Sequence, residues 1–360
     1  MSALPDDQQR AKELLEPAIY DYFAGGAGDE IALADNENSF ARLAMLPRVL
    51  RGGPAPDTRV HLPGAPHAAP IVVAPTAFHR LAHPRGELAT ARAAAAAGTV
   101  LISGMAATVA IDEVVAAAQE VRPEAPVWFQ LYLQPEREVT DRLVERAERA
   151  GCTALVVTVD SPVFGERPRD RRNGFHDLPP GYAAENMRDL PGGPPGGTRD
   201  IEMSTEISWR HLEALRASTG LPVLLKGILH PDDAHLAVAH GVDGIIVSNH
   251  GGRQFDAAPA PVDVLPRLTR AVGGAVPLLL DGGVRRGSDV AVALALGACA
   301  VGIGRPVLWG LAVDGEKGVR DVLERFGEEF ERALALCGGR SPADLTPDMV
   351  VPRGFAGGHR

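Results

Sequence analysis

From about residue 70 onward, short apolar runs alternate with longer segments in which apolar residues recur at helical spacing. A continuous apolar run is typical of a strand buried on both faces of a parallel sheet, and the segments between such runs are typical of crossover helices. The eight runs are residues 71–75, 99–103, 127–132, 154–160, 222–227, 244–249, 277–283 and 300–304. Helical spacing is clearest at residues 86–98, 137–151, 232–241, 287–298 and 318–336. The alternation predicts an α/β fold whose strands close into a (β/α)8 barrel, the TIM barrel.

An open, doubly wound sheet is the main alternative, because it is built from the same alternation. Such a sheet usually carries a GxGxxG fingerprint directly after its first strand. No such fingerprint follows the run IVVAP at 71–75, so the closed barrel is favoured.

Two segments fall outside the repeat. Residues 1–65 precede the barrel, and we expect helices there that cap one barrel mouth. Residues 165–207 are polar and rich in Pro and Gly, and they separate the fourth strand from its helix. Active sites of such barrels lie at the carboxyl ends of the strands, so this loop is predicted to be a lid. We therefore predict one domain, residues 1–360, with the barrel at 66–340.

Composition narrows the function classes. The net charge of −10 argues against a nucleic-acid surface, and the chain has no apolar run long enough to span a membrane. The polar N-terminus lacks the layout of a secretion signal, so we expect a cytoplasmic protein. Cys152, Cys299 and Cys337 are far apart and lack CxxC spacing. Buried thiols are therefore favoured over a disulfide framework or a metal site.

Polar side chains gather where the predicted strands end. Active-site residues of a barrel come from these ends, so we expect the side chains to share one site. A single Thr or Ser there could be a simple cap, but the set includes Lys, His, Asp and several Arg. The residues are Thr76, Gln130, Tyr132, Thr158, Asp160, Lys226, Ser248, His250, Arg253, Asp281, Arg285, Gly304 and Arg305.

The last two strand–helix units resemble a phosphate-binding site. In DGGVRRGSD and GIGRP, glycines follow a strand and a helix opens directly afterwards, with Pro306 suited to the first helical position. Free backbone N–H groups at a helix start attract an anion, and Arg285 and Arg305 add further donors. These motifs predict a phosphorylated cofactor or substrate.

Lys226 needs a negative partner if it is buried. The ring of a reduced flavin would provide one, and an ion pair with an aspartate inside the barrel is the alternative. The sequence leaves both open.

The stretch SNHGGRQFD, residues 248–256, contains candidate residues for both catalysis and substrate binding. Histidine is the side chain whose ordinary pKa lies nearest neutrality, so His250 is a candidate general base. The guanidinium of Arg253 matches a carboxylate, and the two intervening glycines allow a close approach of a small substrate. Asp160 could orient His250 and stabilise it once it is protonated.

These motifs resemble the FMN-dependent 2-hydroxy acid oxidases and dehydrogenases, a family that includes glycolate, lactate and 4-hydroxymandelate oxidases and mandelate dehydrogenase. The resemblance covers about residues 14–340 and includes several segments in order. Besides SNHGGRQFD they are YDYFAGGAGDE, APTAFHRLAHPRGELATARAAAAAGT, FQLYLQ, ALVVTVDSPVFGERPRDRRNGF, LLKGI, LLLDGGVRRGSDVAVALALGA and GIGRPVLWG.

The resemblance implies roles for the matching residues. His250 would be the base and Asp160 its support, while Arg253, Arg167 and Tyr22 would hold the substrate carboxylate and Tyr132 would contact the substrate oxygen. Residues implied around the flavin ring and ribityl chain are Pro75, Thr76, Ala77, Gly104, Gln130, Thr158, Lys226 and Ser248. Residues implied around the ribityl chain and phosphate are Asp281, Gly282, Gly283, Arg285, Gly304 and Arg305.

The implied reaction oxidises an (S)-2-hydroxy acid to a 2-oxo acid, with FMN passing electrons to O2 or another acceptor. His250 would take a proton from the α-carbon or from the hydroxyl, and the sequence leaves both routes open. A homo-oligomer, commonly a tetramer in this family, is likewise implied by the resemblance alone.

Small residues mark a departure from the family pattern. ISGMAAT places Gly104 and Ala106 where the family often shows serines and a bulky aromatic residue. A roomier pocket favours a mandelate-like aromatic acid, and RPRDRRNGF is similar to the hydroxymandelate oxidases. A dehydrogenase coupled to a quinone or protein remains an alternative. So do an FMN-containing barrel isomerase, which would not need the His250–Arg253–Asp160 set, and a catalytically idle binding protein.

Overall fold

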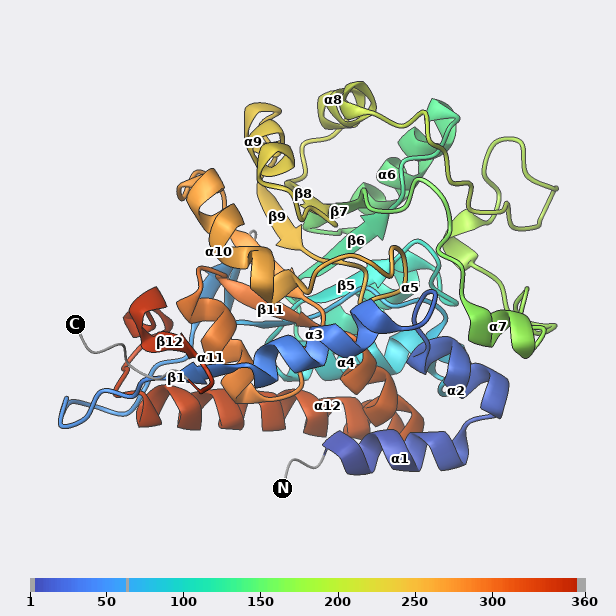
Figure 1. The fold of residues 1–360 in the computed structure, drawn as a ribbon. Coiled ribbons are helices and arrows are strands. Elements are labelled where there is room, and N and C mark those ends of the chain that lie inside the picture. The colour runs from blue at the N-terminus through green and yellow to red at the C-terminus, as the bar shows by residue number, and fades with distance from the viewer. Residues whose placement is uncertain (1–3, 63–64, 355–360) are drawn as a thin grey trace.

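The computed structural model describes residues 4–62 and 65–354, and a closed barrel of parallel strands forms its centre (Figure 1). The strands follow one another around the barrel in the order β10-β11-β4-β5-β6-β7-β8-β9. Closure is made by β11 against β4, where Val301 pairs with Ile71 and Ile303 with Val73. The predicted barrel is confirmed. Its strands are β4 (Ile71–Val73), β5 (Leu101–Gly104), β6 (Val127–Leu131), β7 (Ala154–Thr158), β8 (Val223–Lys226), β9 (Gly244–Val247), β10 (Leu278–Asp281) and β11 (Ala300–Ile303).

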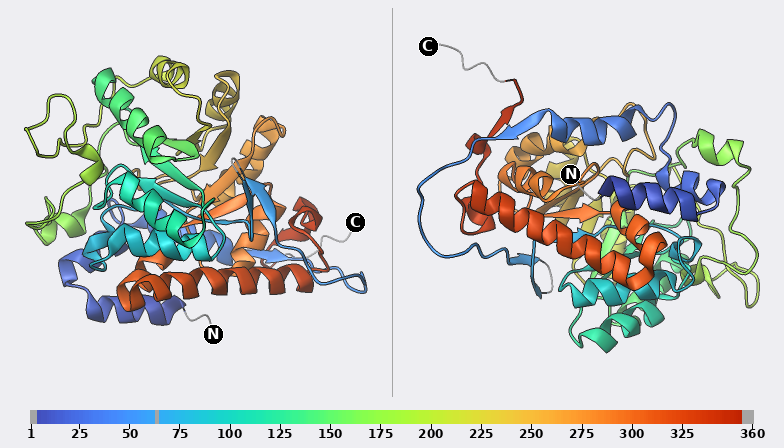
Figure 2. Two further views of the ribbon diagram at one scale, coloured as in Figure 1. Left: turned by 180° about the vertical axis from the view of Figure 1, so that it is seen from behind. Right: turned by 90° about the horizontal axis from the view of Figure 1, so that it is seen from below.

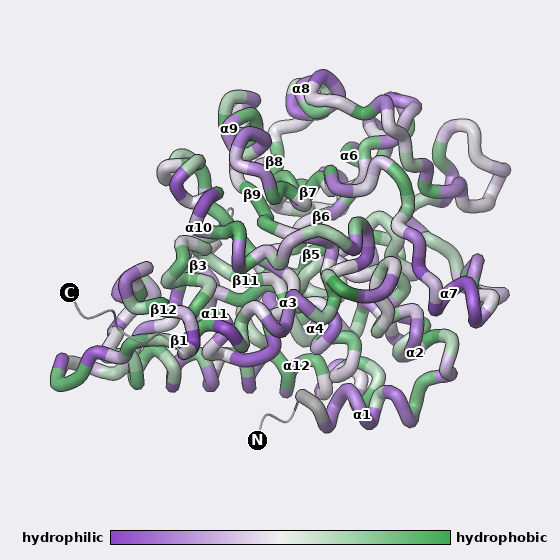
Figure 3. Tube along the Cα trace, viewed as in Figure 1, coloured by the Kyte–Doolittle hydropathy of each residue, from purple (hydrophilic) through white to green (hydrophobic). Residues whose placement is uncertain are grey.

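The strands are mostly apolar, with polar residues only toward their carboxyl ends, because both of their faces are buried. Alternate residues such as Val72, Trp128 and Leu279 point into the barrel and form a separate interior cluster. Their neighbours, such as Val73 and Leu280, pack outward against the surrounding helices. Figure 3 shows hydrophobic segments along these strands. This two-sided burial explains why the runs do not alternate with polar residues.

Helices surround the barrel in chain order. They are α4 (Gly86–Ala96), α5 (Ile111–Val121), α6 (Arg137–Ala150), α8 (Trp209–Ala217), α9 (Pro231–Ala239), α10 (Pro261–Val272), α11 (Gly287–Ala295) and α12 (Arg305–Leu336). Helix α12 begins thirteen residues earlier than the spacing at 318–336 indicated. It is broken at Asp314 and Gly315, whose dihedral angles are not helical. The break explains why the apolar spacing becomes regular only after it. Figure 2 shows α12 running along one side of the molecule.

The N-terminal segment touches both barrel mouths rather than one. It comprises α1 (Leu4–Leu14), α2 (Pro17–Ala24), α3 (Ile31–Ala41), β1 (Leu43–Met45), β2 (Val60–Leu62) and β3 (Ala65–His67). Helix α2 lies against the loop that follows β9, at the carboxyl ends of the strands. Leu62 instead joins the interior cluster beside Val100 and Ala300, which lie where strands begin. Residues 1–3 and 63–64, from the segment expected to form the cap, and residues 355–360 lie outside the described residues.

The segment 165–207 contains local structure. It includes α7 (Pro168–Arg172), a 3-10 turn, η2 (Glu185–Met187), and a β-bridge between Arg188 and Thr198. Asn186 fastens it to the barrel, because its buried amide accepts from the Ile111 N–H at 2.8 Å and donates to the Gly104 carbonyl at 3.2 Å. The chain ends in η3 (Pro342–Asp344), η4 (Pro347–Met349) and β12 (Val350–Pro352), which pairs with β1. A further 3-10 turn, η1 (His79–Leu81), follows β4.

Cys152, Cys299 and Cys337 are free thiols, and Cys299 is partly exposed rather than buried as expected. Across residues 4–62 and 65–354, no helix combines the length and apolar character that crossing a bilayer requires. The same residues contain no cluster of three or more His, Cys, Asp or Glu placed to hold a metal ion.

Alanine substitutions at two glycines should change stability in opposite directions. A methyl group at Gly287 would overlap the α12 backbone at Glu329 and Phe330, so Gly287→Ala should lower the free energy of unfolding by about 1–3 kcal/mol. Gly327 lies inside α12 with open space beside it, so Gly327→Ala should raise that free energy by about 0.4–1 kcal/mol. Denaturant unfolding of both variants tests this. Equal shifts of the same sign would contradict the α11–α12 packing.

Candidate active site

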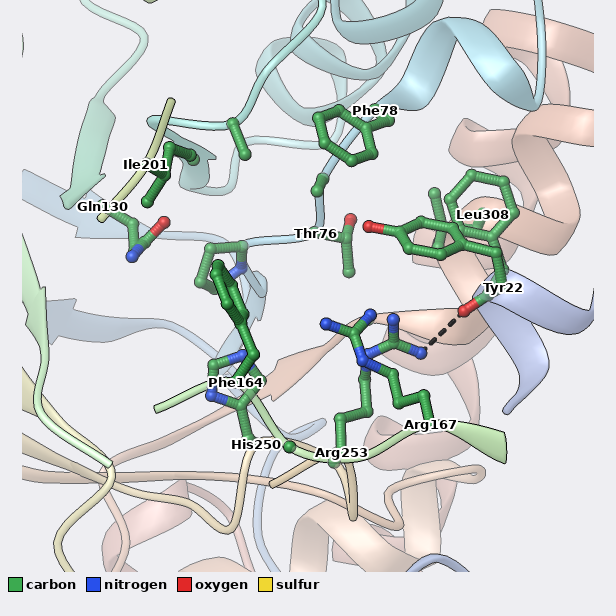
Figure 4. Close-up of a pocket in the computed structure, with 18 of the residues that line it drawn as sticks. Tyr22, Thr76, Phe78, Gln130, Phe164, Arg167, Ile201, His250, Arg253 and Leu308 are labelled. Atoms are coloured by element: carbon green, nitrogen blue, oxygen red, sulfur yellow. Dashed lines mark hydrogen bonds between the residues drawn. The ribbon is translucent and has the colours of Figure 1, made fainter. Parts of the chain in front are cut away.

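One cavity of about 920 Å³ lies at the carboxyl ends of the strands. Helix α2, the loops after the strands and the segment after β7 enclose it. The close-up in Figure 4 shows side chains from these separate elements pointing toward a common space. The predicted site residues that line it are Tyr22, Pro75, Thr76, Ala77, Gly104, Gln130, Tyr132, Arg167, Lys226, His250, Arg253, Asp281, Gly282, Gly283, Arg285, Gly304 and Arg305.

Three predicted site residues, Thr158, Asp160 and Ser248, are not part of the cavity wall. Each lies directly behind a residue that is. Thr158 accepts a hydrogen bond from Gln130 at 2.9 Å, and Ser248 accepts one from Lys226 at 2.9 Å. All three therefore orient wall residues.

His250 and Asp160 form the main polar pair of the site. The imidazole Nδ1 lies 2.8 Å from Asp160 Oδ1, and Nε2 lies 3.4 Å from the Tyr132 hydroxyl. A carboxylate at Nδ1 keeps the proton there, so Nε2 carries the free lone pair. His250 adopts a left-handed conformation with φ of 59°, and Ser248 Oγ accepts its backbone N–H at 3.0 Å. The strand end thus fixes both the direction and the tautomer of the ring.

Asp160 stays ionised although it is buried. Burial alone would raise its pKa, but the charge and hydrogen bond of His250 and the charge of Lys226 outweigh burial and lower the pKa. Tyr132 shows the opposite behaviour, since burial and the nearby Asp160 raise the pKa of its phenol. The site therefore combines a fixed negative charge behind the imidazole with a neutral hydroxyl donor beside it.

Two guanidinium groups lie over the Tyr22 ring. The central carbon of Arg253 is 5.1 Å from the ring centroid, and that of Arg167 is 5.8 Å away. Arg253 also donates to the Tyr22 carbonyl at 2.7 Å, the bond drawn in Figure 4. Burial and the charge of Arg167 lower the pKa of Arg253. Asp170 is 3.5 Å from Arg167, longer than a close ion pair. A bound carboxylate would relieve the repulsion between these two cations.

Lys226 and Asp281 form the ion pair that the sequence left as an alternative. Nζ lies 3.3 Å from Oδ2, both side chains are buried, and both face the cavity. The second oxygen, Asp281 Oδ1, is buried and has no hydrogen-bond partner among the described residues. A hydroxyl donor in the cavity, such as a ribityl O–H of FMN, would satisfy it. Arg285 and Arg305 line the same end of the cavity and are suited to the FMN phosphate.

Sequence reasoning missed the apolar wall of the cavity. It is formed by Phe78, Phe164, Ile201 and Leu308, of which Phe164 is 58% exposed. Phe78 stacks on Tyr22 with ring centroids 5.8 Å apart. It has a left-handed φ of 61°, a conformation that no sequence pattern indicated.

A buried network behind Thr76 was also missed. The Glu87 carboxylate accepts from the His79 backbone N–H at 3.0 Å and from the Thr108 N–H and hydroxyl at 2.8 and 2.7 Å. The His79 ring lies between the hydroxyls of Thr76 at 2.7 Å and Thr90 at 2.9 Å. The network ties the loop after β4 to the loop after β5. Spacing alone gave no signal for it, because the residues come from three elements.

Known proteins resemble this chain over nearly its full length. A family model described as FMN-dependent dehydrogenase matches residues 11–352. Human 2-hydroxyacid oxidase 1 is 47% identical over 356 residues, covering 96% of this chain and 95% of the human protein. Glycolate oxidase of Spinacia oleracea is 43% identical over 349 residues, covering 95% and 93%. A crystal structure of mandelate oxidase with 3,3-difluoro-2-hydroxy-3-phenylpropionic acid has a TM-score of 0.87 and 42% identity, covering 95% of this chain and 96% of that one. One with (S)-2-phenylpropionate gives the same values.

The His79 network predicts a pH dependence of stability. Burial, only partly opposed by the charge of Glu87, lowers the pKa of His79 below its ordinary 6.5. The unfolded chain therefore binds a proton that the folded chain does not, and stability is lost as the pH falls below that value. The loss approaches about 1.4 kcal/mol per pH unit for this one group, and it ends once the pH falls below the lowered pKa of the folded chain.

His79→Gln should therefore show a flatter decline of the free energy of unfolding below pH 6.5. Denaturant unfolding at a series of pH values measures the slope, which is independent of any uniform destabilisation. Parallel curves for the two proteins would exclude a neutral, buried His79.

Proposed function

Since the chain belongs to the FMN-dependent dehydrogenase family, we propose that it oxidises an (S)-2-hydroxy acid to the 2-oxo acid and passes the electrons to O2. FMN is its cofactor and supplies the two-electron redox step when bound. The observation that carries the proposal is that His250, supported from behind by Asp160, lines one cavity together with two guanidinium groups.

The arginines set the orientation of the substrate. Arg253 and Arg167 both face the cavity beside Tyr22, and together they present a fork for one carboxylate. A 2-hydroxy acid held there carries its α-carbon only one bond from the carboxylate. The reacting C–H and O–H groups then lie close to the clamp.

His250 takes up the proton that the oxidation releases. Its Nε2 is the free nitrogen, and the ionised Asp160 behind Nδ1 stabilises the imidazolium that forms. Tyr132, whose raised pKa keeps it protonated, donates to the substrate oxygen. Lys226, close to Asp281 and Ser248, supports negative charge at the cofactor end of the cavity.

We propose an aromatic, mandelate-like substrate side chain. Gly104 and Ala106 leave space in the wall, and the aromatic rings of Phe78 and Phe164 offer apolar surface for a phenyl group. The likeness to mandelate oxidase supports the same choice.

Anaerobic reduction of the bound flavin tests the function. We expect (S)-mandelate to bleach the yellow flavin faster than glycolate does, and air to restore the colour. The His250→Asn variant should retain the flavin. Its rate of flavin reduction by substrate should fall by a factor on the order of 10²–10⁴, the usual contribution of a general base. A colourless protein would contradict the proposal, and so would bleaching of the variant at the wild-type rate. If air fails to restore the colour, the acceptor is a quinone or a protein rather than O2.

Arg167→Met tests the clamp. Removing a charge-assisted hydrogen bond of about 1.5–3 kcal/mol should lower kcat/KM roughly ten- to a hundredfold, mainly through KM. Arg172→Met is the matched control, since Arg172 lies exposed at the other end of α7, the helix that Arg167 directly precedes. Steady-state kinetics on both variants decides the matter. An unchanged KM for Arg167→Met would remove this residue from the clamp.

A further inference from the structure

The C-terminal end of helix α2 lies against the partly buried guanidinium of Arg305. Arg305 Nε donates to the Phe23 carbonyl at 3.0 Å and Nη2 to the Gly25 carbonyl at 2.8 Å. Its Nη1 donates to the Gly251 carbonyl at 2.9 Å, in the loop after β9. One side chain therefore joins the start of α12 to two other segments of the site.

These bonds satisfy carbonyl groups at the end of helix α2. The last carbonyls of a helix have no partner within the helix, and this end carries a partial negative charge. Helix α2 has eight residues, too few for an isolated helix to be stable. Its position therefore depends on tertiary contacts such as those to Arg305.

Close backbone packing adds a second contact. The Ala27 N–H donates to the Gly252 carbonyl at 2.8 Å, and a Cβ at Gly26 would lie only 2.9 Å from that same oxygen. The turn after α2 thus rests directly on the loop that carries His250. The same loop also holds Tyr22, one turn earlier, because Arg253 donates to the Tyr22 carbonyl at 2.7 Å.

Arg305 also has capacity for an anion. A guanidinium has five N–H donors; three of them bond to carbonyls, and residues 4–62 and 65–354 supply no partner for the other two. Arg305 lines the cavity beside Arg285 and Gly304. Burial, with the charges of Arg253 and Arg285, lowers the pKa of Arg305 to about 9. The group is still a cation at neutral pH, and a phosphate would offset its burial.

We propose that Arg305 is a positioning residue that bridges the FMN phosphate and the carbonyls at the end of helix α2, so that cofactor binding and the seating of Tyr22 are coupled. The proposal rests on the placement of the phosphate beside Arg305 in the proposed function. It assigns to Arg305 a role in building the substrate clamp as well as in holding the cofactor.

Hydrogen exchange of the full-length chain tests the coupling. In the wild type, removing FMN should speed amide exchange in residues 17–28 by roughly tenfold, the factor for loss of about one hydrogen bond's worth of stability. In Arg305→Gln at saturating FMN, these amides should already exchange at the faster rate, and removing FMN should change them little. Amides of α4 should remain unchanged in every form.

Arg285→Gln is the matched control, because Arg285 lines the same end of the cavity but pairs with Glu37 rather than with α2 carbonyls. Ultrafiltration should show weaker FMN retention for both variants. At saturating FMN only Arg305→Gln should expose residues 17–28. Should Arg305→Gln fail to fold, Arg305→Lys keeps the charge but lacks the fork and should show the same exchange pattern.

Unchanged protection of residues 17–28 in the Arg305 variants would overturn the proposal. Faster exchange with undiminished FMN retention would overturn it as well, since the bridge requires both ends. Neither readout uses substrate turnover. Failure of the substrate panel with these results intact would refute the proposed reaction and leave the bridge standing.

Discussion

Closure of the barrel between β11 and β4 is the constraint on which the site depends. Parallel pairing of Val301 with Ile71 and Ile303 with Val73 completes the ring and aligns all the carboxyl ends at one mouth. In this way residues more than two hundred positions apart, such as Thr76 and Arg305, line one cavity. Below this mouth the inward-facing residues of the strands form an apolar, buried cluster that fills the ring. The polar side chains are therefore confined to a single layer at the strand ends.

That layer places several charges in a partly buried space, and local pairing makes this possible. Asp160 is hydrogen-bonded to His250 and lies near the charge of Lys226, which pairs directly with Asp281. The arginines differ, because backbone carbonyls rather than carboxylates hold Arg253 and Arg305. Carbonyls satisfy the N–H donors but leave the positive charge in place. In a chain with a net charge of −10, this mouth is a local region of positive charge that attracts an anionic substrate and a phosphate.

The strands and most wall residues could be predicted because each depends on a local pattern. A continuous apolar run followed by a polar residue is sufficient to place His250 or Lys226 at a mouth. Whether a strand-end side chain faces the cavity depends on its neighbours. Thr158 does not face it, because Gln130 lies between Thr158 and the cavity. Phe78 and His79 depend on a left-handed turn and on a network across three elements, for which one sequence holds no local signal. The start of α12 was hidden for a different reason, since its break interrupts the apolar spacing.

Glycines in the two most distinctive motifs are required for the same reason. Gly26 of FAGGAG and Gly252 of HGGR lie where two backbones meet: a Cβ on Gly26 would press on the Gly252 carbonyl, and a Cβ on Gly252 on the backbone of Leu33. Read separately, each motif indicates only a flexible loop or a close approach of substrate. In the folded chain the glycines let a short N-terminal helix approach the barrel closely enough for Arg253 to reach its last carbonyls. The N-terminal segment is thus a wall of the site: Tyr22 reaches the cavity because the backbone beside it carries no side chains at the point of contact.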